Sequence, residues 1–314
     1  MFTKALFADI EEKSIPSEYL NRIKKISEKI LFSASSDPKF IEEISDTNVL
    51  LSNISTKIDK VVIDRASMLK YIGVLATAYD GIDAVYARQK EIPVCNLGGY
   101  STEAVAEFVF ATLFEAIREL ERAKQQARAG DYSFTSFMGI ELKNKVLGVI
   151  GAGKIGSRVA EVGLGIGMKV LYASLHEKPE LEKRGANKVS IDKLMKLSDV
   201  ISLNLIQDDQ TKGIITKEKI GLMKRGAIFV NTAGAKPIDW DAMKQAVKNG
   251  LITLIFHFAH GLDLAVIKEF QQYKNCQFYP GIAFRTAEAN IARWETFTSN
   301  IEQFVMGKPQ NVVN

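Results

Sequence analysis

Short apolar runs alternate along this chain with longer stretches in which apolar residues recur at helical spacing. In the first hundred residues, apolar runs at 5–7, 49–53, 72–76 and 94–96 predict strands, and the amphipathic stretch 19–30 predicts a helix. Strands that alternate with helices are typical of an α/β domain built on a parallel sheet. The first third of the chain is therefore expected to form one such domain.

A second series of strands begins after a long helical pattern over residues 105–127, which ends near Gly130. Its apolar runs lie at 146–150, 170–173, 200–204, 227–231 and 251–258, and helical patterns separate them. Five strands at these intervals predict a doubly wound parallel sheet. A closing helix over 285–306 is expected to return the chain to the first module.

A glycine fingerprint, Gly151-Ala-Gly-Lys-Ile-Gly156, directly follows the first strand of this second series and opens a helical pattern. Glycines at this spacing let the backbone approach a pyrophosphate, which the free amides and the dipole of the helix N-terminus then bind. The turn therefore predicts a bound nucleotide. The alternative is a tight strand–helix turn that holds no ligand.

Composition narrows the class of protein and excludes several partners. The chain has 314 residues, 46% of them hydrophobic and 25% charged, which suits a globular protein of two domains. Its 41 basic and 37 acidic residues are scattered, so neither nucleic acid nor a membrane surface is an expected partner. No targeting segment or long apolar span is apparent, and a cytoplasmic location is expected. Two cysteines and three histidines argue against a disulfide framework and a metal site.

Five motifs, in order along the chain, resemble segments of the D-isomer-specific 2-hydroxyacid dehydrogenase family, in particular its glycerate and phosphoglycerate dehydrogenase-like members. They are 75–83 (LATAYDGID), 92–107 (IPVCNLGGYSTEAVAE), 198–203 (SDVISL), 222–233 (LMKRGAIFVNTA) and the tail 307–314 (GKPQNVVN). The resemblance implies an α/β fold of two Rossmann-like domains with doubly wound parallel sheets. A dinucleotide-binding domain, residues 103–284, is inserted in a smaller flavodoxin-like substrate domain formed by residues 1–102 and 285–314.

The same resemblance implies an oxidoreductase that acts on CH-OH groups with NAD or NADP, binds a small-molecule ligand and forms a homodimer through the cofactor domain. The expected cofactor contacts are Gly151, Gly153, Lys154, Ile155, Gly156, Ser174, Asn204, Thr232, Ala233, Gly234, Phe258 and Gly281. The expected substrate loop contains Ala76, Thr77, Ala78 and Tyr79, whose backbone amides can bind an anionic group. The alternative for that loop is a purely structural role.

The chain departs from the family where the family carries its chemistry. The resemblance implies an arginine that binds the substrate carboxylate and a histidine–carboxylate pair that transfers the proton. Gly234 stands at the arginine position and Gly281 at the histidine position, while Asp263 stands where the family has glutamate. Phe258 takes the place of an aspartate that faces the cofactor carboxamide, so its ring is expected to crowd the nicotinamide pocket.

Cofactor preference and the identity of any substitute groups stay open. Ser174 occupies the position of the acidic residue that contacts the adenosine ribose, so NADP is as compatible as NAD, and His176 and Lys178 lie just beyond it. A solvated loop with incidental charges is the alternative. His260 is a candidate acid–base with Asp263, whereas His257 lies in an apolar run and is interpreted as a packed residue. Lys236 and Arg285 are candidate replacement cations.

Two hypotheses follow for the activity. In the first, the protein is an NAD(P)-dependent oxidoreductase whose 2-hydroxyacid dehydrogenase activity is altered or lost. In the second, it is a non-catalytic protein that binds a dinucleotide and acts through assembly or regulation. An enzyme of another reaction class is a third possibility, because a fold does not dictate chemistry.

Overall fold

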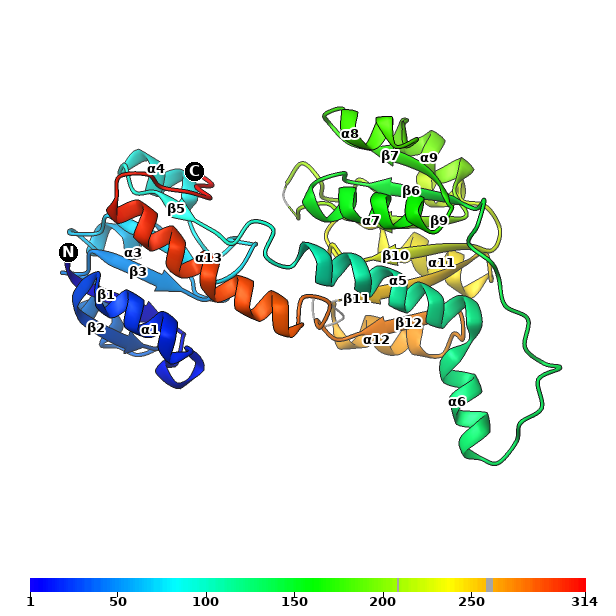
Figure 1. Cartoon of the computed structure of the whole chain (residues 1–314), viewed down its shortest axis with the longest axis horizontal. Coiled ribbons are helices and arrows are strands. Elements are labelled where there is room, and N and C mark those ends of the chain that lie inside the picture. The colour runs from blue at the N-terminus through cyan, green and yellow to red at the C-terminus, as the bar shows by residue number, and fades with distance from the viewer. Residues whose placement is uncertain (208, 258–261) are drawn as a thin grey trace. The chain divides into compact units, whose positions relative to one another are not determined.

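The computed structural model describes residues 1–207, 209–257 and 262–314, and it divides the chain into two compact units (Figure 1). The first unit joins Met1–Ser101 to Ala287–Asn314, and the second unit is Thr102–Thr286. In the part of the chain that is described, no helix is long and apolar enough to cross a membrane.

The first unit contains a five-stranded parallel sheet in the order β2-β1-β3-β4-β5. The strands are β1 (Phe2–Ala8), β2 (Ser27–Ser33), β3 (Val49–Ser52), β4 (Tyr71–Val74) and β5 (Val94–Cys95). This 2-1-3-4-5 order is that of flavodoxin-like domains. The predicted flavodoxin-like fold of this unit is therefore confirmed.

The predicted helix over 19–30 is wrong in its second half. Helix α1 (Ser17–Lys24) ends early, and the chain then enters edge strand β2, which pairs with β1. The reason is tertiary: Phe32 lies opposite Phe7 in the register, and their rings stack with centroids 4.8 Å apart. Burial against the neighbouring strand overrides the local helical pattern.

Helices cover both faces of this sheet and bury separate apolar clusters. The other helical segments are η1 (Glu12–Ser14), α2 (Phe40–Ile44), α3 (Lys60–Arg65), α4 (Ala84–Gln89) and α13 (Ala287–Val305). Ile23 of α1 and Trp294 of α13 belong to one cluster, while Ile63 of α3 belongs to the other. The Arg22 guanidinium links α1 to α13 through ion pairs with Glu295 at 2.6 Å and Glu302 at 2.7 Å.

The second unit contains a seven-stranded parallel sheet in the order β12-β11-β10-β9-β6-β7-β8. Its strands are β6 (Val146–Ile150), β7 (Lys169–Ala173), β8 (Asn187–Lys188), β9 (Val200–Leu203), β10 (Ala227–Asn231), β11 (Ile252–His257) and β12 (Cys276–Tyr279). Counted within this unit, the order is 3-2-1-4-5-6-7, which extends the doubly wound dinucleotide-binding order by one strand. The five predicted strands form its centre, and the short strands β8 and β12 were not predicted.

The helices α5 (Thr102–Arg118) and α6 (Leu120–Arg128) of this unit precede β6. The others lie between the strands along the chain, as the doubly wound prediction requires, and are α7 (Lys154–Gly165), α8 (Pro179–Lys183), α9 (Ile191–Leu197), α10 (Lys217–Gly221), α11 (Trp240–Lys248) and α12 (Leu264–Gln271). The single helix predicted over 105–127 is wrong, because Glu119 adopts a left-handed φ of 51° and separates α5 from α6. An L-residue in that region ends the regular hydrogen-bond ladder.

Candidate dinucleotide-binding site

The glycine fingerprint forms the turn between β6 and α7, and two of its glycines are required by packing. Gly151 has a φ of 88°, and a Cβ on it would lie 2.8 Å from the carbonyl oxygen of Asn204. A Cβ on Gly156 would overlap the carbonyl oxygen of Gly151. Only glycine permits this close approach of the helix to the strand end, because any side chain would displace backbone atoms.

Gly153 differs from these two glycines because nothing lies beside it. It is the N-cap of α7, it makes no side-chain cap hydrogen bond, and a Cβ on it would meet no atom within 4 Å. Lys154 and Ile155 follow as the first helical residues, with Lys154 exposed and Ile155 half-buried. Open space in front of an uncapped helix N-terminus fits a pyrophosphate, which would accept hydrogen bonds from the first-turn amides.

Residues from the neighbouring strands meet this turn at the carboxyl edge of the sheet. The N–H of Gly151 donates to the carbonyl of Ala173 at 2.9 Å, and the N–H of Asn204 donates to the carbonyl of Ile150 at 2.8 Å. The Thr232 hydroxyl donates to Asn204 Oδ1 at 3.3 Å. The structure therefore brings together Gly151, Asn204 and Thr232 where the strand order reverses between β6 and β9, the usual ligand position of such sheets.

Ser174 comes directly after β7 and is half-buried. It lies at the strand end where an acidic residue that contacts the adenosine ribose is expected. His176 is exposed, and Lys178 is the N-cap of α8, with its backbone N–H donating to the Tyr172 hydroxyl at 2.9 Å. Leu175 is 88% exposed and offers an apolar surface beside Ser174. The end of β7 thus presents a hydroxyl rather than a negative charge.

The turn after β10 holds Gly234 in a conformation that only glycine adopts readily. Its φ is 100°, and a Cβ built on it would overlap Nε2 of Gln207 and would lie 2.6 Å from Cδ and 2.7 Å from Oε1 of the same side chain. The fully buried Asn231 fixes the turn: its Nδ2 donates to the Gly234 carbonyl at 2.6 Å and its Oδ1 accepts from the Ala233 N–H at 2.8 Å. Gln207 Oε1 accepts in turn from the Lys236 N–H at 3.2 Å.

Gln207 was missed by sequence reasoning. It lies on the loop after β9, and only the fold brings its side chain over Gly234 on the loop after β10. A glutamine in a polar loop gives no motif of its own. The sequence gives one indirect indication of such a residue. A glycine at the expected arginine position leaves a volume that another side chain must fill.

Asp263, the predicted carboxylate of the proton-transfer pair, and His257, the predicted packed residue, both make backbone hydrogen bonds. Asp263 is exposed and is the N-cap of α12, where its Oδ1 accepts from the Ala265 N–H at 2.8 Å. Buried His257 accepts from the Ala283 N–H at Nε2, 2.9 Å away, and its ring lies 5.1 Å from that of Phe108. An Nε2 that accepts a hydrogen bond carries no proton, so this imidazole is held in a structural role.

The remaining candidates are placed as follows. His260 and Phe258, the second acid–base candidate and the aromatic residue expected at the carboxamide, lie outside the described residues. Gly281 is half-buried and lies two residues before Ala283. Lys236 and Arg285 are both exposed.

The expected substrate loop belongs to the first unit and is hydrogen-bonded to the neighbouring segment at Asn96 and Leu97. The Leu97 N–H donates to the Ala76 carbonyl at 2.9 Å, the Thr77 hydroxyl donates to the Leu97 carbonyl at 3.1 Å, and Asn96 Nδ2 donates to the Thr77 carbonyl at 2.6 Å. Within the described residues, no hydrogen bond is donated by the backbone N–H of Thr77, Ala78 or Tyr79. The loop is hydrogen-bonded to Asn96 and Leu97 and keeps backbone donors for a ligand.

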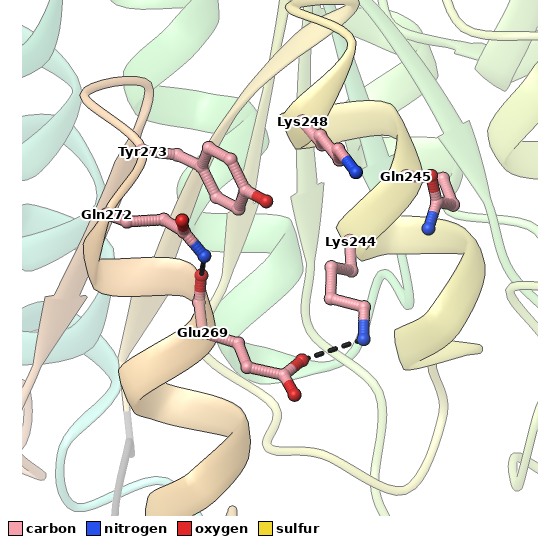
Figure 2. Close-up of a pocket in the computed structure, with 6 residues that line it drawn as sticks. All are labelled: Lys244, Gln245, Lys248, Glu269, Gln272 and Tyr273. Carbon is pink, nitrogen blue, oxygen red and sulfur yellow. Dashed lines mark hydrogen bonds and ion pairs between the residues drawn. The ribbon is translucent and has the colours of Figure 1, made fainter.

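A surface hollow of about 360 Å³ lies between α11 and α12 (Figure 2). Lys244 pairs with Glu269 at 2.7 Å across it, and Gln272 Nε2 donates to the Glu269 carbonyl at 2.8 Å. Its other lining residues are Gln245, Lys248 and Tyr273. These residues are in the last turns of α11 and α12 or just beyond, and the strands that follow begin close to them in the chain. The hollow therefore lies at the amino edge of the sheet, whereas the glycine turn lies at the carboxyl edge.

This geometry defines an α/β protein of two units with a dinucleotide-binding type of glycine turn, and comparison with known proteins agrees with it. Residues 110–258 match the family model described as D-isomer specific 2-hydroxyacid dehydrogenase, NAD binding domain. The glyoxylate reductase of Thermococcus litoralis is 32% identical over 324 residues, which is 96% of this chain and 95% of that protein. The hydroxypyruvate reductase of Blautia hydrogenotrophica is 31% identical over 286 residues, 87% of each chain.

Two solved structures match over nearly the full length. An acyclic imino acid reductase in complex with NADPH and D-Arg has a TM-score of 0.87 and 29% identity, covering 99% of this chain and 100% of that one. A D-lactate dehydrogenase from Aquifex aeolicus, complexed with NAD and lactic acid, has a TM-score of 0.84 and 29% identity, covering 97% and 96%. The chain belongs to the D-isomer specific 2-hydroxyacid dehydrogenase family, and its second unit contains the family's NAD-binding domain.

Proposed function

We propose that this protein is an NAD(P)-dependent oxidoreductase whose activity toward ordinary 2-hydroxy acids is altered or lost. The observation that carries the proposal is Gly234, which stands at the position expected for the carboxylate-binding arginine. It has a φ of 100° and is covered by the Gln207 side chain. An arginine there would meet both a strained backbone and an occupied volume.

The retained glycine turn supports cofactor binding. The first-turn amides of α7 would hold the pyrophosphate in front of Gly153, and Asn204 and Thr232 lie at the adjoining strand ends. When bound, the nicotinamide supplies the hydride that is exchanged with a substrate carbon. The protein's task is to position that carbon and to supply or remove a proton.

We propose NADP as an acceptable cofactor beside NAD. A carboxylate after β7 would repel a 2'-phosphate, and Ser174 carries no charge. His176 and Lys178 follow within four residues and can add positive charge. Among the similar structures, the imino acid reductase binds NADPH and the D-lactate dehydrogenase binds NAD, so the fold accommodates either dinucleotide.

The changed residues at the substrate end support weak turnover of ordinary substrates. Loss of a positioned general acid–base costs a factor of roughly 10² to 10⁴ in rate. Loss of a hydrogen-bonded charged group costs roughly 1.5 to 3 kcal/mol of binding free energy. Gly281 cannot transfer a proton, and Asp263 already caps α12. The backbone donors of the 76–79 loop are proposed to contact the substrate.

The proposal is tested by following the absorbance of NADH and NADPH with a panel of carbonyl and imine substrates. We expect slow or absent turnover of glyoxylate, hydroxypyruvate and pyruvate and measurable turnover elsewhere in the panel. Brisk reduction of those three 2-oxo acids would contradict the assignment of Gly234 and Gly281 to the lost catalytic positions.

A non-catalytic dinucleotide-binding protein is the second candidate, and the structural roles of Asp263 and His257 favour it. Each already makes a backbone hydrogen bond that stabilises its own segment. Calorimetry with ADP, NAD, NADP and the reduced dinucleotides distinguishes the two candidates. Equal affinity for ADP and for the full dinucleotide would support the non-catalytic candidate, whereas preferential binding of a reduced dinucleotide with hydride transfer would exclude it.

We also propose that the protein assembles as a homodimer through the segment that follows α6. Figure 1 shows α6 and this segment extending away from the sheet of the second unit. Tyr132, Phe134 and Met138 are 81%, 80% and 88% exposed. Three large, exposed apolar side chains in one short segment are typical of an interaction surface. Light scattering after size exclusion should give twice the chain mass, and Phe134→Ser with Met138→Ser should give the monomer. A wild-type monomer would contradict this proposal.

A further inference from the structure

The side chain of Gln207 fills the space that a residue larger than glycine at position 234 would need. A Cβ at that position would overlap Nε2 of its amide and would lie 2.6 Å from Cδ and 2.7 Å from Oε1. These distances are well inside van der Waals contact, so the two positions cannot both carry side chains in the present arrangement. A polar amide therefore stands where the side chain of the arginine implied by the family resemblance would begin.

The orientation of this amide follows from its partner. Oε1 accepts from the Lys236 backbone N–H at 3.2 Å, and Nε2 is the amide atom that lies nearest to the Cβ position of Gly234. Within residues 1–207, 209–257 and 262–314, no hydrogen bond is donated by that Nε2. Gln207 is half-buried, so part of its side chain is accessible to a ligand.

Charge distinguishes this arrangement from an arginine site. An amide donates neutral hydrogen bonds, whereas a guanidinium adds a positive charge and a bidentate geometry that match a carboxylate. Desolvating a carboxylate against a neutral donor costs more than the single hydrogen bond returns. A neutral acceptor, such as the oxygen of an amide or ester, carries a smaller desolvation cost.

We propose that Gln207 is the substrate-recognising residue of this protein and that it selects a neutral hydrogen-bond acceptor beside the reacting carbon in place of a carboxylate. The inference rests on the proposed function, because it takes the reacting carbon to lie near the turn at Gly234. It names the class of substrate as 2-oxo or 2-imino compounds in which the adjoining group is an uncharged carboxamide or ester.

The test is calorimetry on protein saturated with NADH and titrated with D-lactamide or D-lactate. These two ligands match in size and differ in charge, and both are already reduced, so binding alone is measured. We expect D-lactamide to bind about tenfold more tightly, which corresponds to one additional net hydrogen bond. Gln207→Met keeps the length of the side chain and removes its donors, and we expect it to abolish that preference while the melting temperature is unchanged.

Lys236→Met is the matched control, because Lys236 is exposed and its contact with Gln207 is through the backbone. It should leave the affinity for both ligands unchanged. Tighter binding of D-lactate that is lost in Lys236→Met would overturn the inference and identify Lys236 as a relocated cation. An unchanged preference in Gln207→Met, or binding of neither ligand, would also overturn it while leaving the cofactor assignment intact. Failure to bind NADH would overturn the proposed function, and the inference with it.

Discussion

Gly156 of α7 packs so closely on the carbonyl oxygen of Gly151 that no side chain fits between them, whereas Gly153, three residues earlier, faces open space. The glycines of the fingerprint thus have two separate roles, one in packing and one in ligand binding. Gly151 and Gly156 let the helix approach the strand end, and Gly153 leaves room for a ligand at the helix N-terminus. The two purposes predict different phenotypes.

Alanine at these positions should separate stability from ligand binding. Gly153→Ala should leave the melting temperature unchanged, because its Cβ meets no atom within 4 Å, and should weaken NADH binding by about tenfold. Gly156→Ala should lower the free energy of unfolding by about 1 to 3 kcal/mol through overpacking. Urea unfolding and calorimetry measure both effects. If both variants lost stability equally, the open space at Gly153 would have no special relation to the cofactor.

A substitution at Ser174 should shift the relative affinity of the protein for NADPH and NADH. Ser174→Asp places a carboxylate after β7, which would accept hydrogen bonds from the ribose of NAD and repel the 2'-phosphate of NADP. We expect the ratio of NADPH to NADH affinity to fall by about tenfold or more. Ser174→Asn is the uncharged control and should change that ratio little. A ratio that did not move would mean that the adenosine ribose lies elsewhere.

His257 is expected to be a stability residue. His257→Phe fills a similar volume and leaves the Ala283 N–H without its acceptor, which costs about 1 to 3 kcal/mol for a buried donor. Urea unfolding should report that loss, and exposed His176→Phe should not. A variant with undiminished stability and abolished turnover would instead make His257 a catalytic residue.

Asp9 predicts an acid-dependent loss of stability in the first unit. Burial raises its pKa, but hydrogen bonds from the Ser35 hydroxyl and N–H and from the Thr56 hydroxyl lower it more, so the pKa lies below its ordinary value of 3.8. Because the pKa of Asp9 is lowered in the folded state, its ionised carboxylate stabilises the folded protein at pH values above the unfolded-state pKa. This stabilisation is lost as the pH falls through the folded-state pKa.

The variant Asp9→Asn isolates this contribution, because asparagine tolerates the left-handed φ of 57° at this position as well as aspartate does. We expect the variant to be about 1 to 2 kcal/mol less stable at pH 7. The difference should narrow below about pH 4, near the unfolded-state pKa of aspartate. Urea unfolding between pH 7 and pH 3 measures it, and a difference independent of pH would exclude titration of Asp9 as its cause.

The alternation of apolar runs and helices predicted most of the architecture, because buried parallel strands produce continuous apolar segments. It missed β2, β8 and β12, which are edge strands of their sheets. An edge strand is half-exposed and owes its conformation to the neighbour with which it pairs, as Phe32 does to Phe7. The break at Glu119 was missed because no glycine or proline marks it.

The glycine turn was predictable because its function restricts its residues. Gln207 was not, because its contact with Gly234 joins two loops whose shapes the sequence does not encode locally. Asp263 carries a second signal: an aspartate directly before an apolar helix is an ordinary N-cap residue, and the structure shows it in that position, while its catalytic role stays a prediction.

We propose that this chain holds a nicotinamide dinucleotide but lacks the groups that act on ordinary 2-hydroxy acids. The most direct measurement is kcat/KM for hydroxypyruvate at saturating NADH or NADPH, made side by side with the Blautia hydrogenotrophica hydroxypyruvate reductase. With cofactor binding shown in the same sample, we predict a value lower by a factor of about 10² or more, as expected for loss of a general acid–base. A value equal to that of the reference enzyme would show that the chain retains a working acid–base and a working carboxylate-binding group.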